Sequence, residues 1–103
     1  MPLPPKLQTA VNALLTQPGA TERELRRAVL ERTRSAAAQI PEALREFVEK
    51  IADRPWTVSD QDFARLRAAG YSEDELYEVT LAAAIGAGLQ RFDAGLRALE
   101  EDR

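Results

Sequence analysis

The sequence predicts an all-α protein of about five helices, with short helices first and one long helix at the C-terminal end. Almost no segment shows the alternation of apolar and polar residues that is typical of a half-buried strand. Apolar residues instead recur every three or four positions, and helix start and stop signals are dense along the chain. The length of 103 residues corresponds to a single domain, which we place over residues 1–103.

The first predicted helix runs from about Pro5 to Gln17 and ends at Pro18-Gly19, a pair that does not continue a helix. Its apolar residues are Leu7, Val11, Leu14 and Leu15.

The second predicted helix runs from about Glu22 to Ala38. Thr21 and Glu24 have the spacing of a capping box at its start. Its apolar side carries Leu25, Ala28, Val29 and Ala36, and its charged positions include Arg23, Arg26, Arg27, Arg32 and Arg34. The arginines form either a phosphate-binding face or a solvated face laced with ion pairs. We favour ion pairs, because glutamates are interleaved and the pairs Glu22–Arg26 and Arg27–Glu31 have i,i+4 spacing.

The third helix is predicted from about Pro41, which suits a first helical turn, to Asp53. It carries Leu44, Phe47, Val48 and Ile51. A linker over residues 53–59 leads to the fourth helix, predicted over residues 60–69 around Phe63 and Leu66. Ser59 caps this helix, Asp60 and Asp62 favour its N-terminus through the helix dipole, and Gly70 ends it.

The fifth and longest helix is predicted from about Glu73 to Glu100. Ser72 and Glu75 form a capping box at its start, and Tyr71 is expected to pack as a staple before the cap. A stripe of bulky apolar residues follows at steps of three and four, made of Leu81, Ile85, Leu89, Phe92, Leu96 and Leu99.

Glycines interrupt this long helix at Gly86, Gly88 and Gly95, and three interpretations compete for them. A dinucleotide-binding loop needs a third glycine where Arg91 stands, and it needs a preceding strand. A membrane span needs about 18 or more apolar residues, and charged residues flank this segment too closely. The remaining interpretation is a small-residue face for close helix packing, because a helical glycine costs about 0.5–1 kcal/mol relative to alanine.

Close packing therefore predicts an interface on the fifth helix, made of Ala84, Gly88, Phe92 and Gly95. Its partner is either another helix of the same chain or the same helix of a second subunit. A helix without Cβ atoms at the contact allows a partner backbone closer than the usual separation of about 8–10 Å between axes.

Composition excludes several classes of chemistry. The chain has no cysteine and no histidine, so thiol chemistry, disulfides and the commonest zinc ligands are absent. We expect no cofactor, no metal and no catalytic residue. The net charge of −3 argues against nucleic acid as a partner, and no signal peptide or membrane segment is evident, so the expected compartment is the cytoplasm.

A resemblance covers the chain from Asp53 onward. It is carried by Pro55-Trp56, Val58, Asp60, the stretch LRAAGYSEDELYEVTLAAA and Arg91-Phe92. This segment resembles the C-terminal portion of the carboxymuconolactone decarboxylase and alkylhydroperoxidase D-like superfamily. The resemblance implies an all-helical fold in which long helices pack between subunits as dimers, trimers or hexamers. It also implies peroxidase chemistry at a Cys-x-x-Cys pair with a histidine, or histidine-containing decarboxylase sites, and this chain has neither residue type.

Three residues are candidates for ligand binding. Trp56 either stacks on a ligand or covers the core as a buried linker aromatic. Arg91 either anchors a carboxylate or phosphate or pairs with Glu78 or Asp93. Tyr77 is the third candidate, beside the start of the long helix.

The leading hypothesis is a small non-redox helical protein that works by association. It forms a homo-oligomer, pairs with a related catalytic subunit, or binds a small molecule. The alternative is an isomerase or lyase that uses Glu, Tyr or Arg in an intersubunit pocket. Nucleic-acid binding through the second helix is a third and weaker interpretation.

Overall fold

The computed structural model describes residues 3–102, which contain five α-helices, one short 3-10 helix and no strand. The helices are α1 (Pro5–Thr16), α2 (Arg23–Ser35), α3 (Glu42–Asp53), α4 (Asp60–Ala68) and α5 (Glu73–Glu101), and η1 (Pro55–Thr57) lies between α3 and α4. The all-α prediction is confirmed, including the long last helix.

Most of the predicted helix ends agree with the structure to within one residue. Ser59 and Ser72 both take part in capping boxes. Gly70 has a φ of +107°, and the N–H of Tyr71 donates to the carbonyl of Leu66 at 3.1 Å. This is the hydrogen bond of a Schellman motif, which requires a residue that tolerates the left-handed region after the helix.

Two details of α2 differ from the prediction. The helix ends at Ser35 and not at Ala38, because Ala36 turns into the left-handed region with a φ of 59°. Thr21 does not cap the helix. The N-cap residue is Glu22, and the Thr21 hydroxyl donates instead to Glu78 of α5 at 2.6 Å.

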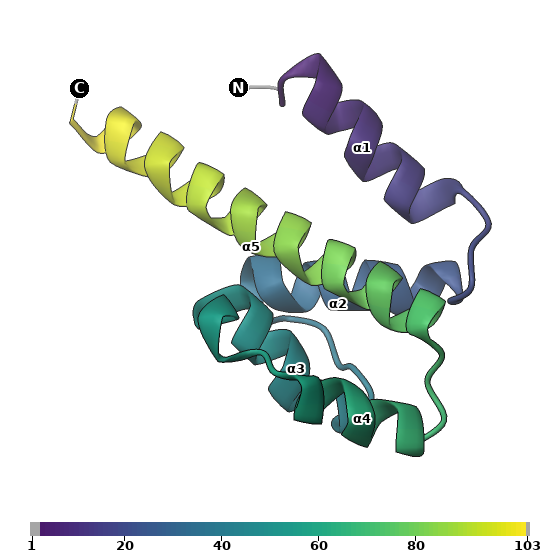
Figure 1. Cartoon of the computed structure of the whole chain (residues 1–103). Helices are drawn as coiled ribbons and strands as arrows, with labels where there is room; N and C mark the ends of the chain where they lie inside the picture. Colours follow the sequence, from purple (N-terminus) through teal and green to yellow (C-terminus); the bar gives the residue numbers. More distant parts are fainter. Residues whose placement is uncertain (1–2, 103) are drawn as a thin grey trace.

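The core lies where α2, α3, α4 and α5 meet. Figure 1 shows α5 lying along α2, with α3 and α4 below them. Phe47 of α3 and Phe63 of α4 pack edge to face, with ring centroids 5.4 Å apart. The buried cluster comprises Val29, Ile40, Leu44, Phe47, Val48, Leu66, Leu76, Val79, Ala82 and Ala83.

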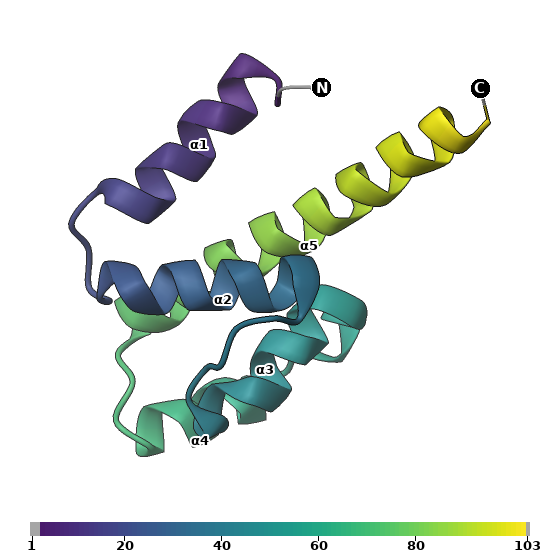
Figure 2. The same cartoon turned by 180° about the vertical axis from the view of Figure 1, so that it is seen from behind.

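α1 and the C-terminal half of α5 lie at the edge of this core or beyond it, although Leu14 of α1 packs against the buried cluster. α1 contains no buried residue, and the last buried residue of α5 is Leu89. The two segments extend on the same side of the molecule, where both chain ends also lie (Figures 1 and 2).

The chain is more extended than a monomer of its mass usually is. Its accessible surface is 6746 Å², whereas a compact monomer of this mass exposes about 5,800 Å². Its radius of gyration is 14.4 Å, against about 13 Å for a compact domain of this length. The projecting helices contribute to this excess, since α1 and the end of α5 contain no buried residue. No helix in the described part of the chain is long and apolar enough to cross a membrane.

Candidate functional site

One side of α5 faces away from the core and carries no charged residue. We call it the outer face of α5. It comprises Tyr77, Leu81, Ala84, Ile85, Gly88, Phe92, Gly95, Leu96 and Leu99, which recur at helical spacing. Tyr77 is 66% exposed, Leu81 38% and Leu99 65%, while Ile85, Phe92 and Leu96 are half-buried. Three residues in ten of the chain are charged, so a helix face of this length without charge is unusual for a solvated surface.

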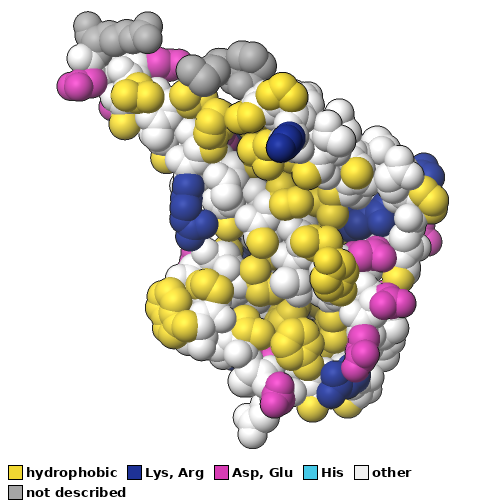
Figure 3. Space-filling view, turned by 45° about the horizontal axis from the view of Figure 1, so that its top comes forward, with side chains coloured by type: hydrophobic (Ala, Val, Ile, Leu, Met, Phe, Trp, Pro, Cys, Tyr) yellow, Lys and Arg dark blue, Asp and Glu magenta, His cyan; other side chains and the backbone are white. Residues whose placement is uncertain are grey.

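α1 adds apolar side chains on the same side of the molecule. Leu7, Val11, Leu14 and Leu15 are half-buried, and none of them enters the core fully. Figure 3 shows apolar side chains gathered in a band from the α1 and α5 ends across the middle of this side, with charged groups mainly at its edges. An apolar surface that spans two helices and is rimmed by polar groups is typical of an interaction site.

The bulky stripe predicted on α5 is divided between two environments. Leu89 is 1% exposed, whereas Leu81 and Leu99 are exposed. The stripe that packs on the core is a different one, formed by Leu76, Val79, Ala82, Ala83 and Gly86. The remaining bulky residues therefore belong to the outer face.

The glycines of α5 have two distinct environments. A Cβ added at Gly86 would overlap the carbonyl oxygen of Leu30 and the hydroxyl of Thr33 on α2. A Cβ added at Gly88 or Gly95 would meet no atom within 4 Å. Among residues 3–102, close packing therefore falls on Gly86, and no atom lies within 4 Å of a Cβ built at the predicted interface positions Gly88 and Gly95. The alternative of a second subunit against them stays a prediction.

A buried ionic network holds the α1–α2 connection against α5. The Glu78 carboxylate accepts the N–H of Ala20 at 2.7 Å, the N–H of Thr21 at 2.9 Å and the Thr21 hydroxyl. It also pairs with Arg26 at 3.3 Å, and Arg26 is 3% exposed. Burial alone raises the pKa of Glu78, but the hydrogen bonds and the Arg26 charge outweigh it, so its pKa is lowered. The network holds the segment that follows the C-terminal end of α1 against α5, beside the outer face.

The arginines of α2 pair across the bundle and not along their own helix. Arg34 makes a bidentate contact with Asp93 of α5, at 2.8 and 3.1 Å, and this contact lowers the pKa of Asp93. Arg32 lies 3.7 Å from Glu49 of α3. The i,i+4 pairs predicted for Glu22–Arg26 and Arg27–Glu31 do not form among residues 3–102. Ion pairing itself is confirmed, since three of the five arginines are paired with acids of other helices.

Asp62 is a structural ion at the start of α4. It is 2% exposed, and Lys50 of α3 donates to both of its oxygens at 2.9 and 3.1 Å. The Ser59 N–H also donates to it at 2.9 Å. The Lys50 and Ser59 hydrogen bonds lower the pKa of Asp62 to about 2, against the opposing effect of burial. Asp62 therefore lies at the N-terminus of α4, as predicted, and it also forms a buried ion pair with Lys50.

An open cavity of about 460 Å³ lies between α5 and the α3–η1–α4 segment. Its walls are mostly apolar, and Arg91 is the one charged residue among those that line it. The lining residues are Phe47, Ile51, Pro55, Val58, Phe63, Thr80, Ala84, Ala87 and Arg91.

Arg91 does not pair with Glu78 or Asp93, because Arg26 and Arg34 occupy those carboxylates. Its Nη2 instead donates to the carbonyl of Ala52, in the last turn of α3, at 2.9 Å. The prediction of an acidic partner for Arg91 is wrong for this reason.

The two other predicted ligand residues lie near this cavity without lining it. Trp56 follows the lining residue Pro55, but its side chain is 79% exposed, so the interpretation as a buried core aromatic is wrong. Tyr77 lies one turn before Thr80 on the same helix. Of the three candidates, the structure thus brings only Arg91 to the cavity wall.

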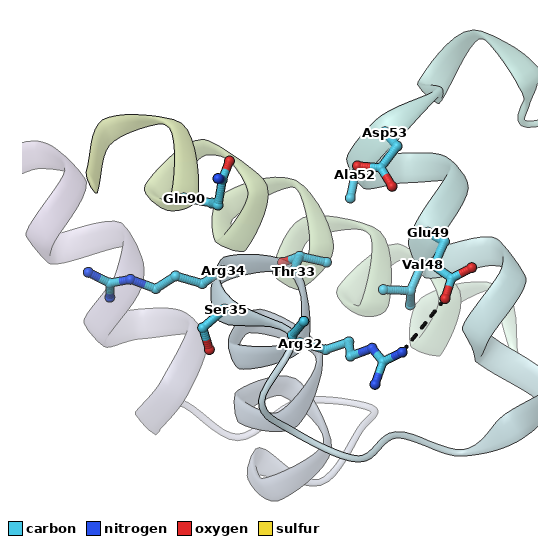
Figure 4. Close-up of a pocket in the computed structure, with 10 residues that line it drawn as sticks. Arg32, Thr33, Arg34, Ser35, Val48, Glu49, Ala52, Asp53 and Gln90 are labelled. Atoms are coloured by element: carbon cyan, nitrogen blue, oxygen red, sulfur yellow. Dashed lines mark ion pairs between the residues drawn. The ribbon is translucent and has the colours of Figure 1, made fainter. Parts of the chain in front are cut away.

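A second cavity, of about 440 Å³, opens between the end of α2, α3 and α5. Figure 4 shows its polar lining, with the Arg32–Glu49 pair on one side and Arg34 directed away from it. Gln90 and Asp53 contribute further polar groups. Among residues 3–102 no three His, Cys, Asp or Glu side chains are grouped so that they could hold a metal ion.

Several of these features have no counterpart in the sequence-based predictions. The predicted interface does not include Gly86, and the sequence predicts neither the Thr21–Glu78 contact nor the Lys50–Asp62 pair. The stripe that contains Gly86 steps by three and four from Leu76, so its spacing identifies it. The two ionic contacts join residues far apart in sequence and leave no such signal.

Comparison of the chain with protein-family models, with curated proteins and with solved structures found no match. The resemblance to the carboxymuconolactone decarboxylase and alkylhydroperoxidase D-like superfamily therefore gains no support from these comparisons and stays a prediction.

Proposed function

We propose that this chain functions by self-association and forms a homodimer through the outer face of α5, with α1 extending the contact. The observation that carries the proposal is the absence of charged residues on that face between Tyr77 and Leu99. A helix normally buries its apolar face against a partner, whereas the outer face of α5 stays exposed or half-buried within the chain.

The excess surface supports the same conclusion. The chain exposes roughly 1,000 Å² more than a compact monomer of its mass. A stable dimer buries about 800 Å² on each partner. The projecting helices therefore offer about the area that such an interface needs, without any rearrangement of the core.

A second copy is the occupant that the geometry favours. Gly88 lies next to the midpoint of α5, so two copies of the helix that cross there present the same surface to each other. Ala84, Gly88 and Phe92 form a ridge of i, i+4 positions. Ridges of this kind cross at about −50°, which keeps the acidic ends of the two helices apart.

The enzyme alternative has no observation in its favour. The carboxylates whose pKa is shifted are Asp62, Glu78 and Asp93, and each is lowered by a cationic or hydrogen-bonding partner. A general acid needs the opposite shift. Nucleic-acid binding through α2 is likewise disfavoured. Few of its arginines are available for phosphate, because Arg26 is buried and Arg32 and Arg34 are paired with acids.

Sedimentation equilibrium over a range of concentrations tests the proposal. We expect the mass of a dimer at low micromolar concentration, and we expect Leu81→Glu to shift the protein to monomer. Ala64→Glu adds the same charge at an exposed residue of α4 and should leave the dimer intact. A wild-type chain that stays monomeric up to about 100 µM would contradict the proposal. That outcome is also the one expected if a different subunit occupies the face.

A further inference from the structure

We infer that the apolar cavity beside Arg91 binds a small monocarboxylate with an apolar tail. The site is distinct from the proposed dimer contact, although Ala84 borders both. It is formed by α3, the segment from η1 to α4, and α5 of one chain.

Arg91 supplies the carboxylate-binding group. Its single hydrogen bond to the Ala52 carbonyl holds the guanidinium at the cavity wall. No Asp or Glu lies within 4 Å of it in the part of the chain that the structure describes. A guanidinium has five N–H donors, so most of them remain for a ligand, and a carboxylate accepts two of them in parallel.

The remaining walls select an apolar tail. Phe47, Ile51 and Val58 line one side of the cavity, and Ala84 and Ala87 line the other. The one hydroxyl in the lining, that of Thr80, already donates to the carbonyl of Leu76 at 2.7 Å. A sugar or nucleotide would lose its hydrogen bonds to water here without replacement, whereas an alkyl or aryl group would not.

The polar cavity at the end of α2 is a weaker candidate for the same ligand. Its arginines are already paired, Arg32 with Glu49 and Arg34 with Asp93. An incoming carboxylate would have to displace a protein carboxylate from either of them. The unpaired cation and the apolar wall occur together at the Arg91 cavity.

Octanoate is a suitable probe, with 1-octanol as the uncharged analogue of the same length. Titration calorimetry measures both, and the emission of Trp56, the single tryptophan, reports binding next to Pro55. We expect octanoate to bind the wild-type chain more tightly than octanol. Arg91→Gln should weaken octanoate binding about tenfold and leave octanol unchanged. Arg97→Gln removes the same charge from the same helix outside this cavity and should change neither.

A second variant tests the location of the tail. Thr80→Phe fills the cavity and removes only a hydroxyl that bonds its own helix, so both probes should lose binding while the melting curve shows a folded protein. Equal affinity for octanoate and octanol, or an Arg91→Gln variant that keeps octanoate binding, would overturn the inference. Sedimentation of the same samples keeps the two proposals separate. A dimer that binds no octanoate contradicts only the cavity, and a monomer that binds it contradicts only the dimer.

Discussion

Gly86 of α5 lies directly against the carbonyl group of Leu30 on α2. A Cβ built on Gly86 would overlap the Leu30 oxygen and stand 3.1 Å from its carbonyl carbon. The contact involves backbone on both helices, so neither side can yield by a simple rotamer change. The packing of α5 against α2 at this point thus depends on the absence of a side chain at Gly86.

Gly86→Ala should therefore destabilise the fold, although alanine is the better helix former. We expect a loss of at least about 2 kcal/mol, since overpacking against backbone costs more than a helical glycine does. Gly95→Ala is the matched control, because its Cβ would meet nothing within 4 Å and should raise stability by about 0.5–1 kcal/mol. Thermal unfolding at low protein concentration distinguishes the two. A Gly86→Ala variant as stable as the wild type would show that α2 and α5 are not packed this closely.

Asp62→Asn should remove a stabilising contribution that depends on pH. The pKa of Asp62 is lowered from 3.8 to about 2, so its ionised form is favoured by folding. Its contribution to the free energy of unfolding is up to about 2 kcal/mol. The contribution is complete above the pKa of the unfolded state, and it is lost as the pH falls through the pKa of the folded state, near 2. Urea unfolding at pH 7 and pH 3 measures this. The difference between wild type and variant should shrink at the lower pH.

Asp60→Asn is the control for this prediction, since Asp60 is an exposed residue of the same helix turn. It should change stability by about 0.5 kcal/mol or less at either pH. An Asp62→Asn variant with the same loss at both pH values would mean that packing, and not the charge, accounts for the effect.

Glu78→Gln should be among the most destabilising single changes in α5. It leaves the buried guanidinium of Arg26 without a counter-charge, and the Nε of that side chain already has no hydrogen-bond partner among the described residues. Breaking one side of a buried ion pair costs about 3–5 kcal/mol. Replacing both residues, as in Arg26→Met with Glu78→Met, should recover part of the loss in urea unfolding. No recovery in the double variant would assign the loss to the Thr21 and Ala20 hydrogen bonds instead.

The sequence predicts the helices well because their signals are local. The Ser72–Glu75 box and the Gly70 stop each lie within a few residues of the helix end that they define. The spacing of apolar residues then fixes which parts of the chain are helical. Spacing does not decide which of two apolar stripes of a helix packs on the core, and α5 has two such stripes.

The partners of charged and small residues are less predictable for the same physical reason. Thr21 has the local spacing of a cap, but a carboxylate 57 residues away is the stronger acceptor for its hydroxyl. Glu78 and Asp93 lie on the same helix as Arg91, yet both pair with arginines of α2. Such choices depend on how the helices cross, which the local pattern does not determine. Of the candidate ligand residues, Tyr77 and Arg91 lie on the long helix, where helical spacing constrains their positions, whereas Trp56 lies in η1.

The last prediction concerns Gly88, at the centre of the outer face of α5. A Cβ at this position would meet no atom of residues 3–102 within 4 Å, so we expect that Gly88→Leu does not lower the melting temperature of the monomer at high dilution. In the proposed dimer the added side chain separates the two helices where they cross, and we expect the dissociation constant to rise at least about tenfold. Gly88→Ala should have a smaller effect in the same direction, because a single methyl group displaces the partner less. Sedimentation measures association, and unfolding at high dilution measures the fold. If Gly88→Leu leaves association unchanged, the dimer contact lies elsewhere on the molecule. If the variant unfolds at high dilution, another part of the same chain already covers Gly88.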